Sequence, residues 1–224
     1  MSVPPAQLGR PVGADGEQTR ARIIAAAMRC VADMGYSRTT IREIARAADM
    51  TSGSLYHYFP NKSQLLGAAV EDIERIAVPR LRDAAAQADD VVDRLTAVLD
   101  EASRMMREQP HLAAFDRAVR TESTEHPVRG RPKYLGLTAL RRIIIEILRD
   151  ARTDGALPPG TDPGAAADAV HALARGLTER AATLDADAYA ATLASAKAVI
   201  SGALFVRPAN HPKSTARRRS APGL

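Results

Sequence analysis

Apolar residues recur along most of this chain at intervals of three and four positions, the spacing that places them on one face of an α-helix. In the first such segment, over residues 17–35, the recurring apolar positions are Ile23, Ile24, Ala27, Met28 and Val31. No segment shows the alternation of apolar and polar residues that is typical of a half-buried strand. The pattern therefore predicts an all-α protein.

Capping residues indicate where the next helices begin. Thr40 is followed three positions later by Glu43, which is the sequence of a capping box, so we expect a second helix to start there. Thr51 is placed to cap a short third helix over residues 52–58, and Pro60 forbids the smooth continuation of that helix. These two helices are separated only by a tight turn.

Helical patterns continue to near the end of the chain. A fourth helix is expected after the cap Asn61, and Pro79 is expected to kink or end it. Residues 121–131 are polar, contain Pro and Gly, and are predicted to form a loop. Asp162 and Asp187 are expected to cap the last two helices. The later helices are predicted over residues 91–106, 110–119, 132–154, 163–183 and 187–205.

The chain divides into four parts by composition and pattern. Residues 1–16 are rich in Pro, Gly and Ala and are predicted to be a flexible arm. Residues 17–66 form a three-helix unit, and residues 67–206 form a larger helical domain. Residues 207–224 are rich in Pro and basic residues and are predicted to be a disordered tail.

The capped helix, tight turn and short helix between Thr40 and Pro60 together predict a helix-turn-helix. In this arrangement the second helix enters the DNA major groove, and its first residues meet base edges and phosphates. Short hydroxyl side chains and a glycine allow close approach, while aromatic and basic groups reach phosphates. The predicted DNA-binding residues are Thr40, Thr51, Ser52, Gly53, Ser54, Tyr56, His57 and Lys62.

Other side chains of this segment have different expected roles. Leu55, Tyr58 and Phe59 are predicted to hold the short helix against the core rather than to touch DNA. For Arg42 and Arg46 the pattern favours neither of two alternatives, a contact with phosphate or simple solvation.

The distribution of charge limits what the net charge of +5 can mean. Residues 207–224 carry five cations and no acid, so the rest of the chain is formally neutral. The tail either adds phosphate contacts that do not depend on sequence or serves as a solubilising end. An architectural, non-specific DNA-binding protein driven by this tail is therefore the alternative to a sequence-specific regulator.

The run TTIREIARAADMTSGSLYHYFPNKSQLL resembles the DNA-binding segment of the TetR family of bacterial transcriptional regulators. The resemblance covers roughly residues 18–68. It implies nine or so helices, an N-terminal DNA-binding domain and a larger domain for ligand binding and dimerisation. It also implies a homodimeric repressor of a palindromic operator, which a small effector releases. The residues that match the family pattern are Thr40, Ile41, Ile44, Ala45, Ala48, Gly53, Leu55, Tyr56, Tyr58, Phe59, Lys62 and Leu65.

The larger domain supplies candidates for an effector cavity. Methionine is adaptable, and apolar neighbours suit a hydrophobic ligand. Arg120 and Arg175 either anchor an acidic headgroup or are ordinary surface charges, and the second alternative is favoured. Helices 163–183 and 187–205 are compatible with a four-helix dimer interface. The predicted ligand-binding residues are Met105, Met106, Phe115, Tyr134, Leu137 and Leu140.

Signals for other functions are missing from the sequence. There is no nucleophile elbow, Gly-rich phosphate loop, HExxH motif or carboxylate dyad, so we expect neither an enzyme nor a cofactor. His111, His126 and His171 have neither HxxxH spacing nor a cysteine partner, so no metal site is expected. Cys30 is expected to be an inert buried thiol rather than a redox sensor.

Features of membrane and secreted proteins are also missing. The N-terminal residues hold no apolar run typical of a signal peptide, and no stretch approaches the roughly 18 apolar residues of a membrane span. One cysteine cannot form an intramolecular disulfide. The expected location is therefore the cytoplasm.

Overall fold

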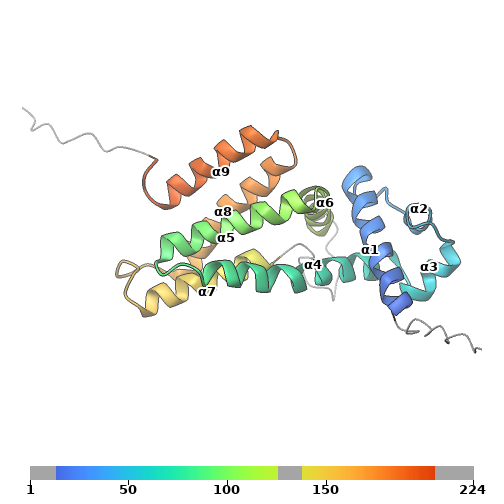
Figure 1. Cartoon of the computed structure of the whole chain (residues 1–224), viewed down its shortest axis with the longest axis horizontal. Coiled ribbons are helices and arrows are strands. Elements are labelled where there is room, and N and C mark those ends of the chain that lie inside the picture. Colours follow the sequence, from blue (N-terminus) through green and yellow to red (C-terminus); the bar gives the residue numbers. More distant parts are fainter. Residues whose placement is uncertain (1–13, 126–137, 205–224) are drawn as a thin grey trace, which may run out of the picture.

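The computed structural model describes residues 14–125 and 138–204, and all regular structure in these two ranges is helical. The all-α prediction is confirmed for this part of the chain (Figure 1). Its helices are α1 (Ala14–Met34), α2 (Ile41–Ala47), α3 (Ser52–Tyr58), α4 (Lys62–Ala85), α5 (Val91–Glu108), α6 (Leu112–Glu125), α7 (Ala139–Thr153), α8 (Pro163–Ala181) and α9 (Ala186–Ile200).

The helices form a small head and a larger body. Helices α1–α3 make up the head, and α4 runs from it along the whole length of the body (Figure 1). Helices α5 and α7 pack against α4, while α8 and α9 form an outer layer on the body. The predicted domain boundary at residue 66 lies inside α4, so one continuous helix connects the two parts.

One apolar core extends from the head into the body. Ile23 and Leu55 of the head, Leu65 of α4 and Phe115 of α6 are all fully buried and belong to the same cluster. An ion pair of 3.1 Å between Arg20 and Asp72 adds a polar link between α1 and α4. Because the core is shared, a displacement of α4 or α6 is expected to move the head.

Pro79 does not end α4, which excludes one of the two effects that the sequence predicted for it. The helix continues to Ala85 although proline removes one backbone hydrogen bond. Leu81 and Ala85, which follow the proline, are buried against the body, and Arg80 forms an ion pair of 2.6 Å with the buried Glu101 of α5. Burial and this charge pair offset the local cost, which the sequence pattern could not show.

Several helix ends differ from the predicted ones. Helix α1 already begins at Ala14, so the last residues of the predicted arm 1–16 are helical. Helix α6 continues to Glu125, into the predicted loop 121–131. Asp185, rather than Asp187, accepts the capping hydrogen bond of α9. The predicted caps of α2, α3, α4 and α8 are confirmed, and they are Thr40, Thr51, Asn61 and Asp162.

Helix α7 is capped by a side chain from a distant part of the sequence. Glu74 of α4 accepts hydrogen bonds from the backbone N–H and the hydroxyl of Thr138, and from the N–H of Ala139 at 3.1 Å. Its other oxygen accepts from Arg142 at 3.2 Å. The start of α7 is therefore fixed to α4, and α4 carries the head.

None of the helices in residues 14–125 and 138–204 is long and apolar enough to cross a bilayer.

Candidate nucleic-acid interface and effector cavity

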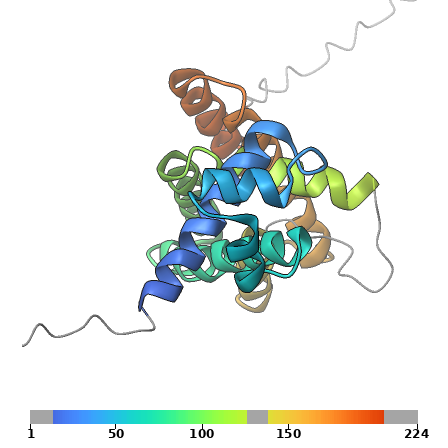
Figure 2. The ribbon, with the colours of Figure 1, turned by 90° about the vertical axis from the view of Figure 1, so that its right-hand side faces the viewer.

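The outer face of α3 is exposed. Leu55 and Phe59 are buried beneath the helix, as predicted, while Tyr56 is 52% exposed and His57 is exposed beside it. Figure 2 shows α2 and α3 lying together on the end of the molecule that faces the viewer. The head therefore presents α3 outward, as the helix-turn-helix prediction requires.

Tyr58 does not take the position that the sequence predicted for it. Its side chain is 38% exposed, so it is not part of the core. The helix is only seven residues long, and the two positions that Leu55 and Phe59 occupy are sufficient to bury one side of it. Tyr58 thus adds a further aromatic group to the exposed face of the head.

The two threonines predicted to contact DNA also cap helices. Thr40 Oγ1 accepts from the Glu43 N–H at 3.3 Å, and the Thr40 N–H donates to the Glu43 carboxylate at 2.7 Å. The Thr40 hydroxyl also donates to this carboxylate at 2.8 Å, and it and the Thr40 N–H hold the pKa of Glu43 below its usual range. Thr51 Oγ1 accepts from the Ser54 N–H at 3.1 Å. Both threonines stay exposed, so capping leaves them accessible.

Gly53 has a conformation that other residues could also adopt. A Cβ atom added here would meet only Thr51 Oγ1, at the ordinary contact distance of 3.8 Å. The fold of the head therefore does not require glycine at this exposed position. The DNA contact of Gly53 stays a prediction.

Lys62 lies differently from its predicted position. Its ammonium group donates to the carbonyl oxygens of Tyr36 at 2.8 Å and Thr39 at 3.0 Å, and lies 4.4 Å from the centre of the Tyr36 ring. Burial lowers the pKa of this group. In this structure Lys62 fixes the α1–α2 connection instead of pointing outward to a phosphate. Its partners lie 23 and 26 residues away, so no local pattern indicated them.

A hollow between α2 and the start of α3 is lined by two arginines and by the acids Glu43 and Asp49. Arg42 and Arg46 line it, are exposed, and form no hydrogen bond or ion pair with any residue that the structure describes. The sequence left their role open, and this placement beside Thr51 favours contact with phosphate. Asp49 lies at the same hollow with a backbone φ of 53°, a left-handed conformation that favours Gly, Asn or Asp.

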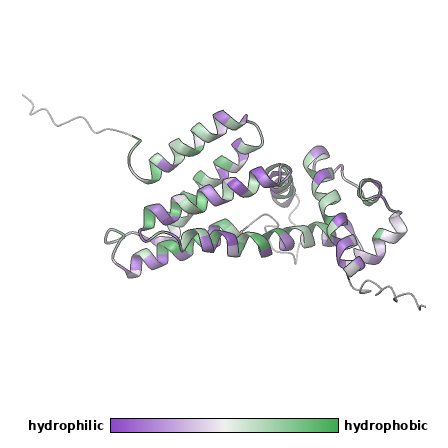
Figure 3. Ribbon diagram, viewed as in Figure 1, coloured by the Kyte–Doolittle hydropathy of each residue, from purple (hydrophilic) through white to green (hydrophobic). Residues whose placement is uncertain are grey.

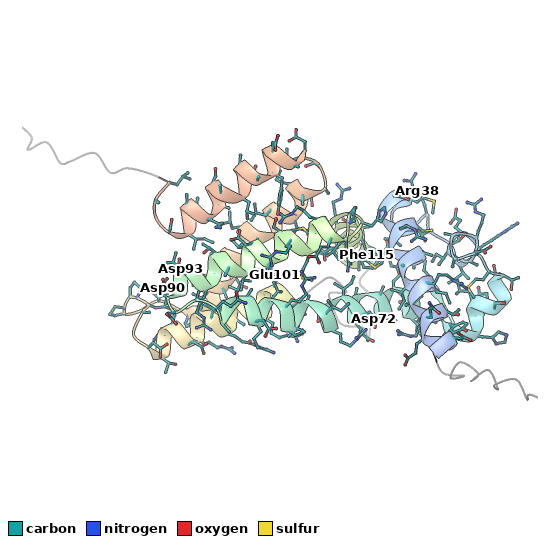
Figure 4. All side chains as sticks on the ribbon, viewed as in Figure 1. Arg38, Asp72, Asp90, Asp93, Glu101 and Phe115 are labelled. Carbon is teal, nitrogen blue, oxygen red and sulfur yellow. The ribbon has the colours of Figure 1, made fainter. Side chains whose placement is uncertain are left out.

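The body contains a cavity of about 80 Å³ between α4, α5, α6, α7 and α8. Three of the predicted ligand-binding residues, Met105, Met106 and Leu140, line it. Phe115 does not, because it is fully buried in the core that α6 shares with α1, where Figure 4 labels it. Tyr134 and Leu137 fall outside the described residues.

One end of this cavity is polar. Asp116 of α6 and His171, Arg175 and Thr178 of α8 line it. From the sequence, His171 was a candidate only as a metal ligand, and Asp116 and Thr178 were not predicted to line a site. The spacing of His171, Arg175 and Thr178 on one face of a helix could have indicated Thr178. Asp116 comes from another helix, so this spacing does not indicate it.

Arg120 is not the ordinary surface charge that the sequence favoured. Its side chain is 12% exposed, and its Nε donates to Asp116 at 2.9 Å. Glu179 adds a second carboxylate at 3.8 Å from the guanidinium. Arg120 therefore balances the charge of Asp116 next to the cavity.

Cys30 and the histidines show no further site. Cys30 is buried, as predicted, and burial raises the pKa of its thiol, which disfavours the reactive thiolate. The described residues hold no group of three His, Cys, Asp or Glu side chains placed to bind a metal ion. His126 lies outside the described residues.

Comparison with known proteins supports the interpretation of the head. The family model for bacterial regulatory proteins of the tetR family matches residues 23–69, which include the whole helix-turn-helix. Over these residues the chain matches the tetR family of bacterial regulatory proteins.

Curated relatives are similar to part of this chain. The transcriptional regulator TtgR of Pseudomonas putida is 36% identical over 81 residues, which cover 36% of this chain and 38% of TtgR. The repressor KstR of Mycobacterium tuberculosis is 34% identical over 96 residues, 42% of this chain and 43% of KstR. Both matches thus span less than half of either protein. These relatives are transcriptional regulators, in agreement with the expectation that the chain is not an enzyme.

Solved structures match the fold over most of the chain. FadR of Bacillus subtilis, solved with stearoyl-CoA, has a TM-score of 0.70 at 19% identity and covers 83% of this chain and 99% of its own. FadR of Bacillus halodurans has a TM-score of 0.69, also at 19% identity, over 87% of this chain and 96% of its own. At this identity the likeness shows the fold alone.

Proposed function

We propose that this chain is a TetR-family transcriptional repressor that binds a palindromic operator as a dimer and is released by a small hydrophobic effector. The exposed face of α3, with Tyr56 and His57 outward and the exposed arginines Arg42 and Arg46 beside it, is the observation that carries this proposal. A helix presented in this way fits the major groove, and the arginines lie where phosphates would flank it.

The outer layer of the body supports the dimer. Helix α9 buries only Tyr189 and Ala196 within the chain, although most of its residues are apolar. Figure 3 shows α9 in pale to green colours over most of its length. Val199 is 47% exposed, and α8 exposes a row of small residues at helical spacing that permits close packing. That row consists of Ala165, Ala169, Ala172 and Gly176.

The position of the cavity supports control by an effector. Ile73, Ala77 and Leu81 of α4 line it, and the same helix continues into the head. Glu74, next to Ile73, fixes the start of α7, whose Ala139 and Leu140 line another wall. A molecule that enlarges the cavity would displace α4 relative to α7, and the head would move with α4. The distance between two α3 helices in a dimer would change accordingly.

Operator binding tests this function directly. Purified chain is titrated onto the DNA upstream of its own gene by fluorescence anisotropy, with a scrambled duplex of equal length as control. We expect binding to an inverted repeat with half-sites about one helical turn, ~34–36 Å, apart or somewhat wider. Affinity should be at least about 1000-fold higher than for the scrambled duplex.

The alternative, an architectural DNA-binding protein, predicts a different result. A chain truncated after residue 206 lacks the five cations of the tail. If the regulator proposal is correct, the truncated chain keeps its preference for the inverted repeat and shows at most a shallower salt dependence. Loss of most affinity on truncation, together with equal binding to both duplexes, would reject the proposal in favour of the architectural one.

Asp49 offers a test of where DNA lies on the head. Replacing Asp49 with asparagine keeps a residue that tolerates the left-handed conformation and removes a negative charge beside Arg42 and Arg46. We expect operator affinity to rise about three- to fivefold at low salt. In each of the two heads the substitution removes the repulsion between the Asp49 carboxylate and a DNA phosphate about 10 Å away in water. Asp83→Asn, an exposed site on the body, is the control and should change nothing. An unchanged affinity for Asp49→Asn would place DNA away from this hollow.

A further inference from the structure

Arg175 lies at the cavity without a protein partner. It lines the polar end, and it forms no hydrogen bond or ion pair with any residue that the structure describes. The residue is exposed overall, so water can solvate its guanidinium while the cavity is empty. Asp116 is the other charged residue in the lining, and it already forms an ion pair of 2.9 Å with Arg120. The cavity therefore carries one uncompensated positive charge.

His171 adds a hydrogen-bonding group next to Arg175. It lies one helical turn before Arg175 on α8 and lines the same end of the cavity. Burial lowers its pKa, and the positive charges of Arg175 and Arg141 lower it further, whereas Asp168 and Asp116 act in the opposite direction. The imidazole is thus neutral at pH 7 and has one N–H to donate. Thr178 already donates its hydroxyl proton to the Ala174 carbonyl at 3.2 Å.

The rest of the cavity is apolar and adaptable. Its walls include Ile73, Ala77, Leu81, Met105 and Leu140. The volume of about 80 Å³ is roughly half of the ~150 Å³ of a protein cavity that binds benzene, so an alkyl chain that enters has to enlarge the cavity, as the proposed displacement of α4 requires.

Met106 connects the cavity to a second, wider hollow. Met106 and Ala113 line both spaces, and the second one is bounded by α9 residues such as Tyr189 and Leu193. Because methionine changes rotamer readily, a longer alkyl chain could pass Met106 into this space. The two hollows together therefore have room for longer alkyl chains than the cavity alone.

We propose that the effector is an apolar carboxylic acid, whose carboxylate pairs with Arg175 and accepts a hydrogen bond from His171 while its alkyl chain lies against α4, α5 and α7. This inference rests on the proposed function, since it assigns the chemistry of the effector at that same cavity. The guanidinium matches a carboxylate in charge and geometry. An amine would instead meet an unpaired cation, and the acid it could bind, Asp116, is already paired.

Straight-chain alkanoates from butanoate to decanoate are the probes, with 1-alkanols and 1-alkylamines of equal length for comparison. The full chain is mixed with its operator, and two quantities are measured: the melting temperature of the protein and the concentration that releases half of the DNA. We expect alkanoates to raise the melting temperature and to release DNA at concentrations at least about 10-fold lower than the matching alkanols, with alkylamines inactive.

Arg175→Gln tests the assigned residue. We expect it to weaken the response to alkanoates by about 10- to 100-fold, to the level of the alkanols, while operator binding without ligand stays unchanged. Arg149→Gln removes the same charge from an exposed position on α7 and should respond like the unaltered chain. The inference is overturned if Arg175→Gln keeps the full alkanoate response, if alkanols or amines equal the acids, or if no alkanoate acts.

The two proposals can fail separately. If the chain binds its operator and no alkanoate stabilises it, the effector class is wrong and the repressor function stands. If the chain binds no operator, the repressor function fails. The melting temperatures of the unaltered chain and of Arg175→Gln still decide then whether the cavity binds acids.

Discussion

Replacing Tyr56 and His57 together with alanine is expected to lower operator affinity by at least about 100-fold and to leave the head folded. Both side chains lie on the outer face of α3, and neither contributes to the core that Leu55 and Phe59 form beneath it. A contact with a base edge is worth about 1–3 kcal/mol, a contact with a phosphate somewhat less, and a dimer would lose each contact twice. The expected loss therefore exceeds that of a typical surface substitution.

The measurement is fluorescence anisotropy with an operator duplex at two salt concentrations, beside a thermal melt followed by circular dichroism. Ile76→Ala is the control, because Ile76 is a 42% exposed side chain on α4 outside the helix-turn-helix. The melt of the double variant should match that of the unaltered chain within a few degrees. An operator affinity within twofold of the original would mean that α3 does not enter the groove.

Replacing Ala169 with glutamate is expected to convert the dimer into monomers at micromolar concentration. Ala169 belongs to the row of small exposed residues on α8, so a single chain can accept a larger side chain there. In a twofold-symmetric interface the same patch meets its own copy, so each glutamate would be buried close to an identical charge. Operator affinity should fall by about 100- to 10,000-fold, because one head then binds without the other.

Sedimentation velocity gives the oligomeric state, and anisotropy gives the affinity of the same samples. Ala86→Glu introduces the same change at an exposed position that ends α4, and it should leave a dimer with full affinity. If Ala169→Glu remains a dimer, the interface lies elsewhere than on α8. If it becomes a monomer and still binds with full affinity, the dimer is not needed for operator binding.

Much of the local structure could be predicted from the sequence. Thr40, Thr51, Asn61 and Asp162 cap the helices they were expected to cap, and α3 spans the predicted residues. Each of these features depends on hydrogen bonds and steric limits within two to four residues of the chain. The exposure of Tyr56 and His57 and the burial of Leu55 follow from helical periodicity in the same way.

The predicted cavity residues were only partly correct. Met105, Met106 and Leu140 line the cavity, whereas Phe115, on the same helix as Asp116, turns into the core shared with α1. Apolar periodicity shows that a residue faces inward but does not show which of two inward surfaces it meets. The sequence named Arg175 as one of two alternatives but did not join it to His171 and Asp116 in one site, because Asp116 comes from α6, which is far from α8 in the sequence.

The sequence by itself determined the helices, their caps, the helix-turn-helix and its resemblance to the TetR family, because these depend on neighbours along the chain. Only the tertiary structure decided what depends on partners more than 20 residues away. Burial and the Arg80–Glu101 pair keep α4 helical past Pro79, and distant carbonyl groups hold Lys62 inward. The packing of α8 against α6 likewise places Arg175 at an apolar cavity, because burial of apolar side chains between helices decides where α8 lies.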